Sequence, residues 1–184
     1  MKFILLTLSA LCLLVTSAPA RAEPVSQDTA NDYYKACMTP DDERMSDDAQ
    51  ESLCGCTSAQ MMLVMTAEDI KTMSPKPGPG RAAYDKMLAE AYGPCMQVPV
   101  EENLYEGCMK DGHIKQFALK DQGKLCRCLA TTTTQTLPIE APKIVRKTLE
   151  TAPGMTDPYD IIAYDSNLRK RALDNLTPCL HLGN

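Results

Sequence analysis

The residues of this chain that could do chemistry are its cysteines, and their order occurs twice. Each half of the chain contains a lone cysteine, then a Cys-x-Cys pair, and then a final cysteine directly after a proline. The cysteines of the first half are Cys37, Cys54, Cys56 and Cys95, and those of the second half are Cys108, Cys126, Cys128 and Cys179. Neighbouring residues repeat as well, because Tyr34 and Tyr105 both lie three positions before the first cysteine of their half. This pattern indicates a duplicated structural unit.

The pair Cys54-Gly55-Cys56 is the strongest candidate for redox chemistry. A disulfide that closes across a single intervening residue is strained and therefore oxidising, so it could be passed to a partner protein. Against this function, the corresponding pair of the second half has Arg127 in its middle, and each half offers other cysteines for ordinary bridges. The thioredoxin-type Cys-x-x-Cys motif is also missing from the sequence. We therefore expect all eight cysteines to form structural disulfides, with thiol-disulfide exchange as the alternative function.

Copper(I) binding is a second alternative, because soft sulfur ligands select this ion. Cys54, Cys56, Met61 and Met65 could supply such ligands from neighbouring positions of one helix. Methionines at helical spacing more often fill a core, however, and the second half has threonines in this part of its sequence. We therefore expect no metal site and no cofactor.

Hydrolytic catalysis has little support in the sequence. The chain contains two histidines, His113 and His181, and neither belongs to a nucleophile pattern. A phosphate-binding loop and a haem-attachment motif are both missing from the sequence. We therefore expect a protein without enzyme activity.

Residues 1–22 have the features of a secretory signal peptide. Lys2 gives it a positive start, an apolar run follows over residues 3–15, and small residues precede an expected cleavage site after Ala22. The apolar run is shorter than the roughly 20 residues that span a bilayer, so we expect no membrane span after cleavage. Cleavage removes Cys12 and leaves an even number of cysteines, which favours disulfides in an oxidising compartment. The expected location is therefore the periplasm or the extracellular space.

The mature chain is expected to be acidic. Cleavage takes two of the 19 basic residues and none of the 24 acidic ones, which leaves a net charge of −7. The excess lies in the first half, since residues 23–98 contain 13 acidic and 6 basic residues, whereas residues 99–184 contain 11 of each. We therefore expect no binding to nucleic acid, which requires a basic surface.

Helical signals recur along the first half, and strand signals are weak. The sequence predicts helices over residues 27–38 and 46–65, and a capping box at residues 66–69 opens a third, shorter one. Residues 74–80 contain three prolines and two glycines, which predicts an exposed loop. Helical spacing then returns over residues 84–95.

The second half repeats this order more loosely. Helical spacing is found at residues 104–109, 125–137 and 139–149. Asp157 and Pro158 then open what we expect to be one long helix with an apolar stripe. The stripe consists of Ile161, Tyr164, Leu168, Ala172 and Leu176.

The Cys-x-Cys pair acquires a structural meaning on a helix. Since successive residues are about 100° apart, two cysteines separated by one position point to nearly opposite sides. One can bridge to a preceding helix and the other to a following helix. The face of Cys54 also carries Met61 and Met65. The face of Cys56 carries Ala59 and Leu63, so we expect the central helix to be covered on both sides. Four cysteines per half allow three pairings, which remain open.

Together these features predict an all-α protein of two tandem disulfide-clamped repeats, each with three to four short helices. We place the repeats at residues 23–98 and 99–184, with the boundary at residues 98–100. The expected function is a non-catalytic binding or structural role in the periplasm, the envelope or the extracellular space, with another protein of that compartment as partner. Carriage of an apolar ligand between the two halves is a further alternative. Nothing in the sequence predicts the oligomeric state.

Overall fold

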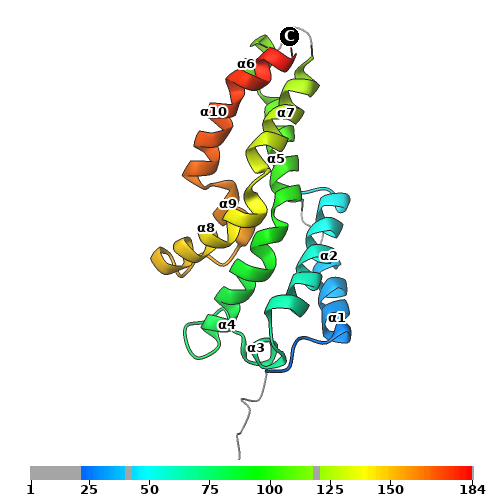
Figure 1. Cartoon of the computed structure of the whole chain (residues 1–184), viewed down its shortest axis with the longest axis vertical. Coiled ribbons are helices and arrows are strands. Elements are labelled where there is room, and N and C mark those ends of the chain that lie inside the picture. The colour runs from blue at the N-terminus through cyan, green and yellow to red at the C-terminus, as the bar shows by residue number, and fades with distance from the viewer. Residues whose placement is uncertain (1–21, 40–42, 118–120, 184) are drawn as a thin grey trace, which may run out of the picture.

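The computed structural model describes residues 22–39, 43–117 and 121–183 (Figure 1). The regular elements of these residues are all helical, and their β contact is limited to an isolated bridge between Pro24 and Thr66. The prediction of an all-α fold is therefore confirmed. The signal peptide expected at residues 1–22 lies outside the described residues, apart from Ala22.

Side-chain caps set the starts of the first helices. Ser26 and Ser46 each accept a hydrogen bond from the backbone N–H three residues further on. Thr66 and Asp69 form the predicted capping box. The elements of this part are α1 (Gln27–Met38), α2 (Asp47–Val64), α3 (Ala67–Thr72), α4 (Arg81–Lys86), the π-helical segment η1 (Met87–Tyr92) and the 3-10 turn η2 (Gly93–Cys95). The two long predicted helices are thus confirmed to within one residue at each end.

The later elements differ from the prediction in several places, because they include helical residues outside the predicted segments, at 97–103 and 112–117, and a break in the long helix expected after Asp157. They are α5 (Gln97–Lys110), α6 (Gly112–Phe117), α7 (Gln122–Thr134), α8 (Leu137–Thr151), α9 (Pro158–Ala163) and α10 (Ser166–Gly183). The expected long helix is interrupted at Asp165, whose carboxylate accepts the backbone N–H groups of Asn167 and Leu168, each at 2.9 Å. Tyr164, which was placed in the apolar stripe, is 69% exposed. The prediction of one continuous helix is therefore wrong, because the cap formed by Asp165 competes with continuation of the helix.

α5 runs through the middle of the molecule and connects its two ends (Figure 1). Toward one end, α2 packs between α1 and η1, and toward the other end α7 packs between α5 and α10. α8 packs on η1 and η2, and α9 packs on α5, α8 and η1. Each half therefore has a central helix between an earlier and a later helical element, as the cysteine pairs predicted.

One main apolar core extends over both halves of the chain. It includes Met61 and Leu88 from the first half and Val145 and Ile162 from the second. A smaller cluster in the second half consists of Cys108, Leu125, Cys126, Leu129 and Cys179. The expected boundary at residues 98–100 lies within the first turns of α5. The division into repeats at 23–98 and 99–184 stays a prediction, and the two stretches share their main core.

The face of α2 that carries Cys56 is covered only in part. Leu63 is 77% exposed and Ala59 is exposed as well, whereas Met61 is 1% exposed. The expectation of a helix covered on both sides is therefore wrong for the last turns of α2. The side of Met61 lies in the main core, and the side of Leu63 is left to solvent.

Candidate functional site

Four disulfides connect the eight cysteines of the described residues. They are Cys37–Cys54, Cys56–Cys95, Cys108–Cys126 and Cys128–Cys179. Their Cα–Cα distances of 5.5 to 5.7 Å lie in the usual range for disulfides. In each half, the first cysteine of the pair bridges to the preceding helix and the second bridges to a following element. The connectivity that the sequence left open is therefore the same in both halves.

The Cys54-Gly55-Cys56 pair has no internal bridge in this structure. Cys54 is bonded to α1 and Cys56 is bonded to η2, so neither sulfur is a thiol in the oxidised protein. Met61 and Met65, the other members of the alternative copper set, are 1% and 2% exposed and belong to the main core. Within the described residues, no group of three or more histidine, cysteine, aspartate or glutamate side chains is arranged to hold a metal ion. These four residues thus serve here as cross-links and core.

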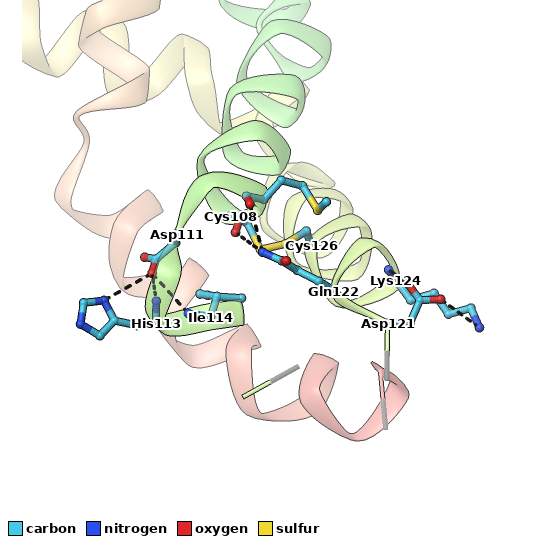
Figure 2. The surroundings of a disulfide bond; sticks show 9 residues. Cys108, Asp111, His113, Ile114, Asp121, Gln122, Lys124 and Cys126 are labelled. Atoms are coloured by element: carbon cyan, nitrogen blue, oxygen red, sulfur yellow. Dashed lines mark hydrogen bonds and ion pairs between the residues drawn. A yellow bond between two sulfur atoms is a disulfide. The ribbon is translucent and has the colours of Figure 1, made fainter. Parts of the chain in front are cut away.

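A glutamine four residues before each pair ties the central helix to the preceding one. The side-chain amide of Gln50 donates to the carbonyl of Cys37 at 3.0 Å. That of Gln122 donates to the carbonyl of Cys108 at 3.1 Å, next to the second-half disulfide (Figure 2). Both carbonyls lie in the last turn of a helix, where carbonyl groups have no intrahelical N–H donor. Sequence reasoning missed this shared contact, although the repeated spacing of glutamine to cysteine was present.

The histidines lie at helix ends. The side chain of His113 is 92% exposed at the start of α6, beside Asp111. The carboxylate of Asp111 accepts the backbone N–H groups of His113 and Ile114, which lower its pKa (Figure 2). His181 is exposed in the last turn of α10. The geometry around His113 is that of a helix start, in which an aspartate satisfies the first free N–H groups.

A cleft of about 700 Å³ opens between the first half of the chain and α9. α1, α2, α4 and η1 contribute to its walls, together with the segment before α2 and the start of α9. Its lining includes four of the seven tyrosines of the chain, Tyr33, Tyr84, Tyr92 and Tyr159. Apolar side chains complete it, among them Ala36, Met45, Leu53, Met87, Leu88 and Met96. The volume lies within the range of small-molecule binding sites.

Two of these tyrosines meet inside the cleft. The rings of Tyr33 and Tyr92 are arranged edge to face, with centroids 6.2 Å apart and an interplanar angle of 84°. The hydroxyl of Tyr33 donates a hydrogen bond to the hydroxyl of Tyr92. Burial raises the pKa of Tyr33, and the adjacent Tyr92 raises it further. Burial also raises the pKa of Tyr92. Both hydroxyls are therefore neutral at physiological pH.

Arg44 connects the segment before α2 to α9 at the edge of the cleft. Its Nη1 lies 2.7 Å from Oδ2 of Asp157 and 3.2 Å from Oδ1 of Asp160. Its guanidinium carbon also lies 4.8 Å from the centre of the Tyr159 ring. Asp157 additionally accepts the backbone N–H of Tyr159 at 2.9 Å and so caps α9. The edge of the cleft is thus built from one guanidinium, two carboxylates and an aromatic ring.

Sequence reasoning did not find this cleft. Its tyrosines come from four separate elements, α1, α4, η1 and α9, so no local pattern connects them. The composition held a signal, because the chain has seven tyrosines, two phenylalanines and no tryptophan. Tyrosine is therefore the main aromatic material from which this chain can build a binding site.

Comparisons with known proteins find no relative. No protein-family model matches the chain, and neither the curated proteins nor the solved structures yield a match. In the part of the chain that the structure describes, no helix is both long enough and apolar enough to cross a membrane. What the molecule does has to be inferred from its own geometry.

Proposed function

We propose that this protein is a non-catalytic binding protein of the periplasm or the extracellular space, which holds a small, largely apolar ligand in the tyrosine-lined cleft. The cleft carries the proposal, since a hollow of about 700 Å³ with apolar walls and a few polar groups is typical of small-molecule sites. Its position between the first half and α9 fits carriage of a ligand between the two halves of the chain. Another protein of the same compartment would deliver or receive this ligand.

The polar groups of the cleft favour binding over catalysis. Burial raises the pKa of Tyr33 and Tyr92, so neither hydroxyl is a useful general base near neutral pH. Arg44 and Asp157 are paired with each other at the edge. The described lining also lacks a serine or histidine that could form a nucleophile and base pair.

The disulfides support a preformed site. Cys37–Cys54 contributes to the lining of the cleft and holds α1 against α2. Cys56–Cys95 holds α2 to η2, directly after the tyrosine-bearing η1. A site that is rigid before binding loses less conformational entropy when the ligand enters. Four disulfides also fit export, because oxidising compartments preserve them.

A neutral fluorescent probe tests this function. N-phenyl-1-naphthylamine becomes brighter when it leaves water for an apolar site. We expect the purified, oxidised protein to bind the probe saturably at a single site, because the apolar lining of the cleft removes the probe from water.

Two tryptophan variants locate the bound probe. Ala36 is an exposed residue of α1 that lines the cleft, so Ala36→Trp should fill part of the hollow with an indole. We expect this change to weaken binding by about tenfold, the equivalent of about 1.4 kcal/mol. Ala59→Trp, on the exposed face of α2, is the matched control and should leave binding unchanged. An absence of saturable binding, or equal losses in the two variants, contradicts the proposed function.

A further inference from the structure

The edge of the cleft carries more negative than positive charge. Arg44 faces the two carboxylates of Asp157 and Asp160, so this group has a net charge of −1 at neutral pH. Asp157 itself lines the hollow, together with Arg44 and Tyr159. A ligand that enters the cleft therefore meets a negative potential at its edge.

Two tyrosine rings of the cleft already contact positively charged side chains of the chain itself. The guanidinium of Arg44 lies 4.8 Å from the centre of the Tyr159 ring, and that of Arg81 lies 5.7 Å from the centre of the Tyr84 ring. Both distances are within reach of the attraction between a cation and the negative face of an aromatic ring. Two of the four tyrosines thus bind cations that belong to the chain itself.

Given the proposed function of the cleft, on which this inference rests, we propose that the ligand is an organic cation: a protonated amine, guanidinium or quaternary ammonium group on an apolar body. The positive group takes the position of the Arg44 guanidinium against Tyr159 and Asp157. The apolar body lies along Leu53 and Met87, which line the hollow.

Arg44 is placed so that it can give way to such a ligand. It belongs to the short segment that precedes α2, outside any helix, and its side chain is 42% exposed. Rotation of this side chain into solvent therefore costs no helical hydrogen bonds. The net charge at the edge then changes from −1 to −2, and a bound cation returns it to −1. This favours a cation over a neutral ligand.

An anionic ligand fits the same edge poorly. A carboxylate or phosphate recognised by Arg44 would have to break its contacts with Asp157 and Asp160. It would then lie beside two carboxylates in a partly desolvated site, where repulsion between like charges is costly. The geometry therefore separates the two ligand classes clearly enough for a direct test.

Three compounds of one shape provide the test. 4-Phenylbutylamine is a cation at neutral pH, 4-phenylbutanol is neutral and 4-phenylbutyrate is an anion. Each is titrated against the protein loaded with N-phenyl-1-naphthylamine, and the loss of fluorescence reports displacement. We expect the amine to displace the probe at a concentration about tenfold lower than the alcohol, with the butyrate weakest, as expected for a charge between the buried ring of Tyr159 and two partly exposed carboxylates.

Two variants connect this preference to the edge of the cleft. Asp157→Asn keeps a good helix cap for α9, because asparagine caps as well as aspartate. It should weaken amine binding about fivefold and affect alcohol binding less. Asp174→Asn, which removes the same charge from an exposed pair on α10, is the matched control and should change neither. Arg44→Gln removes the resident cation and should strengthen amine binding about fivefold.

The outcomes are separable. Equal displacement by the three compounds, tightest displacement by the butyrate, or weaker amine binding in Arg44→Gln each overturn the cationic assignment and leave the proposed function intact. A failure of the neutral probe to bind at all overturns the proposed function itself.

Discussion

The two halves of this chain share a covalent pattern but fill it with different side chains. In each half the central helix is cross-linked to an earlier helix and to a following helical element. The residue between the paired cysteines lies beside an equivalent tyrosine in both. A Cβ at Gly55 would be 4.0 Å from Cε2 of Tyr34, whereas the guanidinium of Arg127 lies 5.2 Å from the centre of the Tyr105 ring. The same position thus lacks a side chain in the first half and carries a cation in the second.

Equivalent buried positions also differ in chemistry. Met61 follows Cys56 by five residues, Thr133 follows Cys128 by five residues, and both side chains are almost completely buried. Met61 packs in the apolar core, whereas the hydroxyl of Thr133 accepts a hydrogen bond from the side-chain amide of Asn175 at 3.4 Å. The same cross-links therefore accommodate apolar packing in one half and hydrogen-bonded packing in the other.

Polar contacts hold α7 on both of its sides. On the α5 side, Thr131 donates to one carboxylate oxygen of Glu101 at 2.6 Å and Thr134 donates to the other at 3.3 Å. On the α10 side, Arg171 donates to the carbonyl of Thr133 at 3.2 Å. Threonines, which are poor helix formers, are present in this helix because they bond to its neighbours. Most of the residues that line the tyrosine-rich cleft belong to the first half, and α9 of the second half closes its other side.

The largest expected effect comes from the disulfides. Cys128→Ala with Cys179→Ala opens a loop of 51 residues and should lower the free energy of unfolding by about 4 kcal/mol. Cys37→Ala with Cys54→Ala opens a loop of 17 residues and should cost about 3 kcal/mol. The second half has the smaller apolar cluster and so depends more on its cross-links. The difference between the two losses in free energy of unfolding should therefore be larger than the loop lengths alone give. Urea unfolding followed by circular dichroism measures both, and a larger loss in the first half would break the ranking.

Exchange of the equivalent buried residues sharpens the comparison. Met61→Thr should lower the free energy of unfolding by about 3 kcal/mol, because it leaves a cavity and an unpaired hydroxyl in the apolar core. Thr133→Val should cost about 1 kcal/mol, since Asn175 loses an acceptor while the volume is kept. Met155→Thr, at an exposed position, is the control and should have almost no effect. Equal costs at positions 61 and 133 would show that the halves are packed alike.

The buried tyrosine pair should make the molecule sensitive to alkaline pH. Burial raises the pKa of Tyr33 and Tyr92 above the ordinary value, so the folded protein keeps protons that the unfolded chain releases. Stability should therefore be retained below about pH 10 and fall above it, by up to about 1.4 kcal/mol per pH unit for each tyrosine. Tyr33→Phe should reduce this slope in denaturant titrations. Tyr164→Phe, at an exposed position, should leave it unchanged, and an equal slope in both variants would place the alkaline response outside the cleft.

The smallest expected effect concerns the residue between the paired cysteines. Gly55→Ala should raise the free energy of unfolding by about 0.5 to 1 kcal/mol, since glycine weakens a helix and the added Cβ has ordinary contact distances. Arg127→Ala should lower it by about 0.5 kcal/mol through loss of the contact with Tyr105. Thermal unfolding resolves both changes. If both variants changed the free energy of unfolding in the same direction, this position would no longer distinguish the two halves.

Local chemistry accounts for the parts of the fold that the sequence predicted. α1 and α2 begin after the serines that cap them, and the capping box at Thr66 and Asp69 opens α3. The rotation of about 100° per residue allowed each cysteine pair to reach two different neighbours, as the four disulfides do. All these effects act within one or two helical turns, so they are visible in a short window of sequence.

Other features depend on competition between local and distant contacts. The apolar stripe after Asp157 favoured one long helix, but the cap at Asp165 starts a new one and turns Tyr164 to solvent. Leu63 has the spacing of a core residue, yet none of the described elements covers it, and it is 77% exposed. Hydrophobic periodicity predicts which residues share a face and does not predict which face receives a neighbour.

The sequence by itself determined the helical class, the starts of α1, α2 and α3 and the double cysteine pattern, because caps and helix rotation act between residues close in the chain. The tertiary structure decided that the halves share a core and that a cleft lies between the first half and α9. Tyr33 meets Tyr92 across 59 residues, and Arg44 meets Asp157 across 113. Such contacts follow from how the helices pack against one another, which no local spacing encodes.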